Sequence, residues 1–175
     1  MTSWGEALRR GALSGSIASL TSTAALAACG ECEDGSPHAP TNAISHWLWG
    51  DRAAREDEPS LRYTGVGYAI HHASATFWAV LYEKWFGRSV ERRELRTSVA
   101  GAAVVSGLAC LVDYTITPPR LRPGYEKRLS AASLCLVYAS FGAGLLLRSL
   151  ATPKPRSGAP ARASPPSARV DTMAI

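Results

Sequence analysis

The chain has 175 residues, enough for one compact unit, and a formal net charge of +5 at neutral pH. That charge would suit a nucleic-acid partner, but the basic side chains flank apolar segments and do not gather in one patch. We therefore exclude nucleic-acid binding and interpret the charge as an indicator of membrane topology.

Four apolar segments follow one another along the chain, at about residues 11–29, 63–82, 97–117 and 129–147. Each is about as long as a helix that crosses the hydrocarbon core of a bilayer. The alternative is a soluble bundle, whose helices would each need a polar face. Residues 97–112 and 129–147 contain no charged side chain and so have no such face. The sequence predicts an all-α protein, a transmembrane four-helix bundle within residues 1–150.

The first apolar segment carries small side chains at every fourth position: Gly11, Gly15, Ser19 and Thr23. These positions share one helical face, and small side chains let helix backbones approach closely in lipid. Such a face would serve packing inside the bundle or the contact of a homodimer. A plainer interpretation is that Ser, Thr and Ala merely dilute a signal-like segment.

The end of this segment, Leu26-Ala27-Ala28-Cys29, resembles the lipobox of bacterial lipoproteins, with Arg9 and Arg10 as the basic leader. The resemblance implies cleavage before Cys29 and lipidation of its thiol. Cys29 also forms a C-x-x-C pair with Cys32. A redox or metal role would need a second pair or a βαβ context, and the sequence offers neither. If this end is periplasmic, a disulfide could join the two thiols.

Residues 30–62 form an acidic first loop, which we expect outside the cytoplasm. Within it, residues 40–50 predict a short helix that ends at Gly50. The candidates for its capping residue are Thr41 and Asn42. Two tryptophans in this stretch predict that the short helix lies at the membrane interface.

The second apolar segment places several polar side chains on one helical stripe: Tyr68, His72, Thr76 and Glu83. His71 points about 100° away from that stripe. The segment ends in aromatic residues around Lys84, a composition typical of a water–lipid boundary. The following loop, residues 84–96, holds five basic side chains, which predict a cytoplasmic position.

The third segment runs past Asp113 to a double proline at 118–119, which ends the helix. The loop that follows has four basic residues, which count against its predicted place outside the cytoplasm. The fourth segment ends at Arg148, and the Pro-, Ala-, Ser- and Arg-rich tail over 151–175 predicts disorder. A basic head and a basic tail predict that both termini are cytoplasmic.

Polar side chains inside apolar segments have three interpretations. The plainest is hydrogen bonding between helices, which contributes roughly 0.6 to 2 kcal/mol for each bond. The second is a metal or haem site, for which the candidate ligands are His46, His71, His72 and Asp113. No H-x-x-x-H, C-x-x-C-H or H-E-x-x-H motif supports it, so we predict no cofactor. The third is a proton or solute path through His72, Glu83 and Asp113.

Catalytic motifs are also missing from the sequence: there is no G-x-S-x-G, Walker loop or paired carboxylate arrangement. We therefore expect no enzymatic activity. The predicted function is that of a multi-pass membrane component, structural or partner-binding, with the lipid bilayer and a second copy or another membrane protein as its partners. The alternative is a small transport or metal- or haem-binding unit centred on His71, His72 and Asp113.

Three strings of the sequence carry a resemblance to a family: residues 41–50, 67–72 and 113–124. They resemble small, uncharacterised inner-membrane proteins of Gram-negative bacteria, over about residues 10–148. The resemblance implies this architecture and a place in the bacterial inner membrane, and it implies no activity. It also suggests that the loop tryptophans, the histidine pair and residues 113–124 form one feature at the outer surface.

Overall fold

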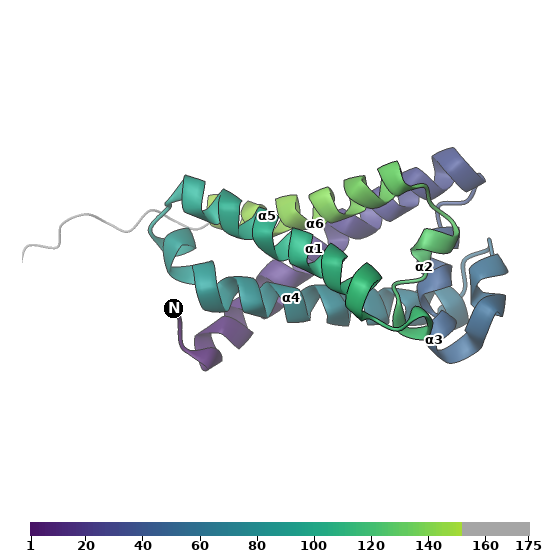
Figure 1. Cartoon of the computed structure of the whole chain (residues 1–175), viewed down its shortest axis with the longest axis horizontal. Coiled ribbons are helices and arrows are strands. Elements are labelled where there is room, and N and C mark those ends of the chain that lie inside the picture. Colours follow the sequence, from purple (N-terminus) through teal and green to yellow (C-terminus); the bar gives the residue numbers. More distant parts are fainter. Residues whose placement is uncertain (152–175) are drawn as a thin grey trace, which may run out of the picture.

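The computed structural model describes residues 1–151, in which long helices form a bundle (Figure 1). The long helices are α1 (Trp4–Asp34), α4 (Val66–Glu91), α5 (Leu95–Leu111) and α6 (Ala131–Ala151). The predicted all-α class is confirmed, since no strand occurs within the described residues. Of the tail predicted for 151–175, residues 152–175 lie outside the described part of the chain.

Successive long helices run antiparallel, and each packs against two others (Figure 1). α1 lies along α4 and α6, and α5 lies along the same two helices from the other side. One end of the bundle, here called the terminal end, holds the N-terminus, the α4–α5 connection and the last described turn of α6. The opposite end, here called the loop end, holds α2, α3 and the connection from α5 to α6.

α1 packs unusually close to its neighbours because glycine stands where the helices meet. A Cβ atom on Gly11 would lie 2.7 Å from the Cα atom of Val80, and one on Gly15 would lie 2.6 Å from the Cα atom of Thr76. Real Cβ atoms essentially never make such short contacts with backbone atoms. The small-residue face predicted for this helix is therefore occupied by α4, within the bundle.

Shorter elements build the loop end. They are α2 (Ala39–Ile44), α3 (His46–Trp49), three 3₁₀ turns (Gly50–Arg55, Pro119–Leu121 and Tyr125–Lys127) and two π-helical turns (Leu61–Gly65 and Val112–Ile116). The single helix predicted over residues 40–50 is thus divided into two at Ser45, and Gly50 ends the second.

The predicted caps, Thr41 and Asn42, were wrong: both lie inside α2, whose N-cap is His38. Pro40 takes the first turn, where its fixed φ angle suits a helix and its missing N–H is not needed. Asn42 is instead fully buried, and its side-chain amide donates to the carbonyls of Glu56 and Glu58 at 2.9 and 3.0 Å. This pair of bonds draws the first loop over α2.

The short helices differ from an interfacial helix that lies flat on a membrane. Every residue of α2 is buried. Of α2 and α3, only α3 turns large apolar side chains outward: Leu48 is 64% and Trp49 is 39% exposed. The side chain of Asn42 accounts for the burial of α2. Its amide donates to two carbonyls of the first loop, so the loop covers the helix.

Three helices of the described chain are long and apolar enough to cross a membrane: α1, the α5 region Leu95–Ile116, and Ala131–Arg148 of α6. α4 has 26 residues and is long enough, but it is not among the three; it carries a histidine pair in its first half and four charged side chains in its second. Length and composition thus single out three of the four segments that the sequence predicts as spans.

Gly15→Ala should destabilise the bundle, because the added methyl group would push α1 away from the backbone of α4. We expect a loss of about 1–3 kcal/mol in the free energy of unfolding in detergent. Gly107→Ala is the matched control, since a Cβ at Gly107 of α5 meets nothing within 4 Å. It should be neutral or stabilising by up to about 1 kcal/mol. Equal effects of the two substitutions would contradict the close packing.

Candidate functional site

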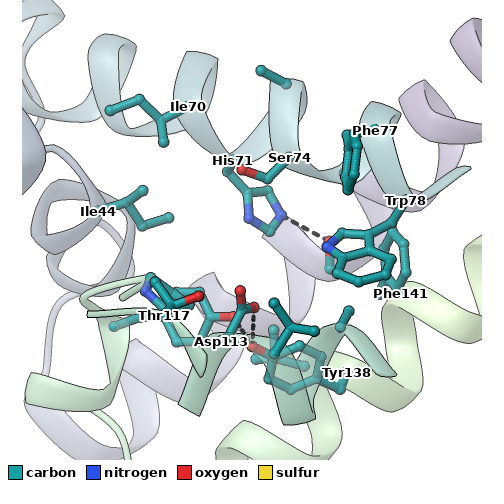
Figure 2. A pocket seen from close by; sticks show the side chains of 18 of the residues that line it. Ile44, Ile70, His71, Ser74, Phe77, Trp78, Asp113, Thr117, Tyr138 and Phe141 are labelled. Carbon is teal, nitrogen blue, oxygen red and sulfur yellow. Dashed lines mark hydrogen bonds between the residues drawn. The ribbon is translucent and has the colours of Figure 1, made fainter. Parts of the chain in front are cut away.

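A cavity of about 460 Å³ lies between the helices at the loop end (Figure 2). All four long helices contribute to its wall, and the connections at the loop end close one side. Six aromatic side chains line it: Trp47, Phe77, Trp78, Tyr125, Tyr138 and Phe141. The ionisable side chains other than tyrosine on this wall are His71 and Asp113. The cavity is therefore apolar with a few convergent polar groups, the usual character of a small-molecule site.

His71 extends from α4 into the cavity (Figure 2). Its Nε2 atom lies 2.8 Å from the Oγ atom of Ser22 on α1. The hydroxyl of Ser22 donates its single proton to the carbonyl of Ala18 at 2.7 Å. We assign the hydroxyl proton to the Ala18 carbonyl, the shortest of the Ser22 contacts; with this assignment Ser22 accepts from the imidazole and the neutral ring carries its proton on Nε2. The other ring nitrogen, Nδ1, is left as a hydrogen-bond acceptor.

Asp113 approaches the cavity from the opposite wall (Figure 2), in the π-helical turn Val112–Ile116 at the end of α5. Its Oδ2 atom accepts a hydrogen bond from the hydroxyl of Tyr138 at 2.6 Å. The hydroxyl of Tyr125 donates in turn to that of Tyr138 at 3.0 Å. This chain of two tyrosines stabilises the carboxyl group with one hydrogen bond and brings no positive charge to it.

The two loop regions at this end are joined by direct contacts. The indole N–H of Trp47 donates to the carbonyl of Arg122 at 2.8 Å. Gly124 has a φ angle of +97°, and a Cβ there would lie 2.5 Å from Nδ1 of His46. Trp47, His71 and several residues of 113–124 line the same cavity, whereas Trp49 and His72 are not part of its wall.

His46 and His72 are not part of the cavity wall. His46 is buried with its Nδ1 atom 2.9 Å from the carbonyl of Ala43. The ring of His72 packs against that of Tyr68, with ring centroids 5.8 Å apart. Within residues 1–151, no group of three or more His, Cys, Asp or Glu side chains could hold a metal ion. The candidate metal ligands named from the sequence therefore do not converge.

The polar stripe of α4 is divided along the helix. Tyr68 and His72 lie towards the loop end, and Thr76 faces Gly15 of α1 in the middle of the bundle. Glu83 lies at the terminal end, where it is fully buried. Both of its carboxylate oxygens are 2.8 Å from Nη1 of Arg148 on α6. The stripe holds several local interactions and forms no single continuous path.

The small-residue stripe of α1 continues beyond its two glycines. Ser19 is fully buried and Thr23 is half-buried. Cys29 is buried within the unbroken α1, and both it and the exposed Cys32 are free thiols. Lipidation at Cys29 stays a prediction from the sequence.

Ion pairs hold the loop end together outside the apolar part of the bundle. Arg128 donates to Asp34 at 2.6 Å and to Asp57 at 2.5 Å, which ties the α5–α6 connection to α1 and to the first loop. Lys127 binds Asp51 at 2.6 Å. The hydrogen bond from Lys127 and the charge of its ammonium group lower the pKa of the Asp51 carboxyl.

The sequence did not predict the partners of Asp113 and Glu83. Tyr138 and Tyr125 sit in or beside apolar stretches, where the general need of a buried carboxyl for a donor could have pointed to them. In the sequence, Arg148 marks only the end of the fourth apolar segment, although in the structure it pairs with Glu83, 65 residues away.

Comparisons with models of protein families, with curated proteins and with solved structures found no match for this chain.

Arg148→Gln should cost about 3–5 kcal/mol in the free energy of unfolding, because it leaves the buried Glu83 carboxylate without its positive partner. The double variant with Glu83→Gln removes both charges and should recover most of that loss. A double-mutant cycle in detergent measures the coupling between the two side chains. If the two single losses simply add, the pair contributes no coupling and the expectation is wrong.

Proposed function

We propose that the chain is an integral membrane protein that crosses a bacterial inner membrane four times, as a structural or partner-binding component and not as an enzyme. The observation that carries this proposal is the distribution of polarity around the long helices. Serine hydroxyls share the interior with apolar side chains, at Ser14, Ser19, Ser22, Ser98 and Ser106, each 7% exposed or less.

Large apolar side chains face outward from the long helices. On α1, Leu8, Leu13 and Leu20 are 58–59% exposed. The other helices expose further side chains of the same kind: Phe77, Val99, Val104, Leu108, Leu111, Leu136 and Leu147. In water this surface would cost about 25 cal/mol for each Å² of apolar area left uncovered. In lipid it costs nothing, and interior small and polar residues become the means of helix association.

α4 fits the role of a fourth span in spite of its histidine pair and its charged side chains. Its polar side chains are turned inward or half-buried, apart from the exposed Ser74 and, near the terminal end, the exposed Arg88. Its outward residues, Ala69, Ala73 and Phe77, are apolar. A lipid-facing surface requires only an apolar outer face, because the inner face meets protein.

Charges at the two ends support an orientation with both termini in the cytoplasm. The terminal end (residues 1–10, 83–96 and 148) has eight Lys or Arg residues and four Asp or Glu residues. The loop end (residues 30–62 and 113–130) has seven of the former and nine of the latter. The four basic residues after α5 count against a position of this loop outside the cytoplasm, but two of them, Lys127 and Arg128, are bound to carboxylates. An excess of Lys and Arg on one side favours the cytoplasm for that side, and the terminal end has that excess by one residue.

The second candidate function is small-molecule binding or transport at the loop-end cavity. It is favoured by one observation: His71 and Asp113, which come from different helices, line the same space. Metal and haem binding lose support from the scattered positions of the four candidate ligands. A homo-oligomer could not use the glycine face of α1, because α4 occupies that face, and would have to use the outward apolar side chains of the long helices.

Membrane integration is tested by extraction of the full-length protein from bacterial membranes. We expect it to stay in the pellet after carbonate and after high salt and to be released only by detergent, because the exposed leucines bind lipid tails. Release by carbonate alone, as a monodisperse species that needs no amphiphile, would refute the proposal.

Orientation is tested with a membrane-impermeant maleimide on intact cells and on opened vesicles. A variant that keeps only Cys32 carries its exposed thiol at the loop end, and Arg92→Cys in a Cys-free chain places one at the terminal end. We expect Cys32 to react in intact cells and the terminal-end thiol only after the membrane is opened. The reverse pattern would overturn the orientation and leave the four spans intact.

A further inference from the structure

The two acidic side chains that lie among the long helices have opposite surroundings. Glu83 has a positive partner, since both of its oxygens contact the guanidinium of Arg148. Asp113 takes part in none of the ion pairs found within residues 1–151. It accepts a hydrogen bond from the neutral hydroxyl of Tyr138. Removing a carboxylate from water without a counter-charge is costly. The bundle therefore compensates one acid internally and leaves the other facing a cavity.

Asp113 and His71, on facing sides of the cavity, each offer an acceptor, whereas the other lining residues Ser74, Thr117 and Trp78 carry donors. Asp113 offers carboxylate oxygens, and the tyrosine chain beside it has already used both of its protons. His71 offers Nδ1, because its Nε2 proton is held by Ser22. A ligand that complements these two groups must donate hydrogen bonds or carry positive charge.

The remaining wall suits a positive charge attached to an apolar body. Aromatic side chains surround the space, and the faces of aromatic rings attract cations within about 6 Å of the ring centroid. The volume of about 460 Å³ is enough for a small organic molecule. Residues Ala73, Ser74 and Phe77 on the rim are exposed on the outer face of α4. If α4 spans the membrane as proposed, this rim opens towards lipid.

We propose that the loop-end cavity binds a lipid-soluble organic cation, an amine or quaternary ammonium on an aromatic or aliphatic body, with Asp113 as its counter-charge. The aromatic wall surrounds the apolar body, and His71 accepts from any N–H that the cation carries. The entry route from lipid rests on the proposed membrane placement, whereas the binding itself rests only on the cavity.

The test uses a pair of isosteric probes with the detergent-purified full-length protein. Phenyltrimethylammonium carries a positive charge, and tert-butylbenzene has the same shape without it. Calorimetric titration should show saturable binding of the cation, and the neutral isostere should not displace it at equal concentration. Asp113→Asn should weaken binding of the cation about tenfold or more, which corresponds to ~1.4 kcal/mol. Glu58→Gln, at an exposed loop acid that takes part in none of the ion pairs found within residues 1–151, is the control and should leave the affinity unchanged.

A second variant keeps the test decisive if Asp113→Asn unfolds the protein. Ser74→Trp, at an exposed position on the rim, should block the cavity and abolish binding while the circular dichroism and thermal unfolding stay as in the parent. The proposal is overturned if the cation does not bind, if tert-butylbenzene competes equally, or if Asp113→Asn and Ser74→Trp leave the affinity unchanged. Carbonate extraction fails or succeeds independently of these results, so the two proposals can be separated.

Discussion

The close approach of α1 to its neighbours is the constraint on which the rest of the structure depends. Glycine backbones on α1 touch backbone atoms of α4, and Gly144 of α6 approaches Ala18 of α1 just as closely. Such contacts allow only one register between antiparallel helices. That register sets Ser22 opposite His71, and the bond between them fixes the ring in the cavity. A methyl group added in the wrong place would therefore alter the cavity as well as the packing.

Electrostatics inside the bundle follow from the same register. At the terminal end, α4 and α6 meet so that Glu83 and Arg148 form a buried pair. At the loop end, the turn after α5 meets α6 so that Asp113 accepts from a tyrosine hydroxyl and takes part in none of the ion pairs found within residues 1–151. A buried pair of opposite charges fixes helix positions. The two ends of the bundle thus differ in how their acidic side chains are compensated, and this difference is the basis of the binding site proposed at the loop end.

Polar contacts hold the loop end together, whereas small side chains hold the long helices together. The buried amide of Asn42 satisfies two loop carbonyls, and Trp47 bonds to the carbonyl of Arg122 in the other connection. Arg128 joins both connections to the end of α1. These bonds close one side of the cavity with backbone and leave its other side open at the outer face of α4. The shape of the cavity therefore depends on loops that have no hydrophobic periodicity of their own.

The amino-acid sequence by itself determined the helices. Uncharged runs such as residues 129–147 and breaks such as the proline pair at 118–119 are local features, so helix identity and approximate length follow from them. Only the tertiary structure decided which polar groups meet. The pairing of Glu83 with Arg148 joins residues 65 positions apart, and the contact of Trp47 with Arg122 joins residues 75 positions apart. Local periodicity gives the direction of a side chain around its own helix, but its partner depends on the register between helices, which backbone contacts at a few glycines set.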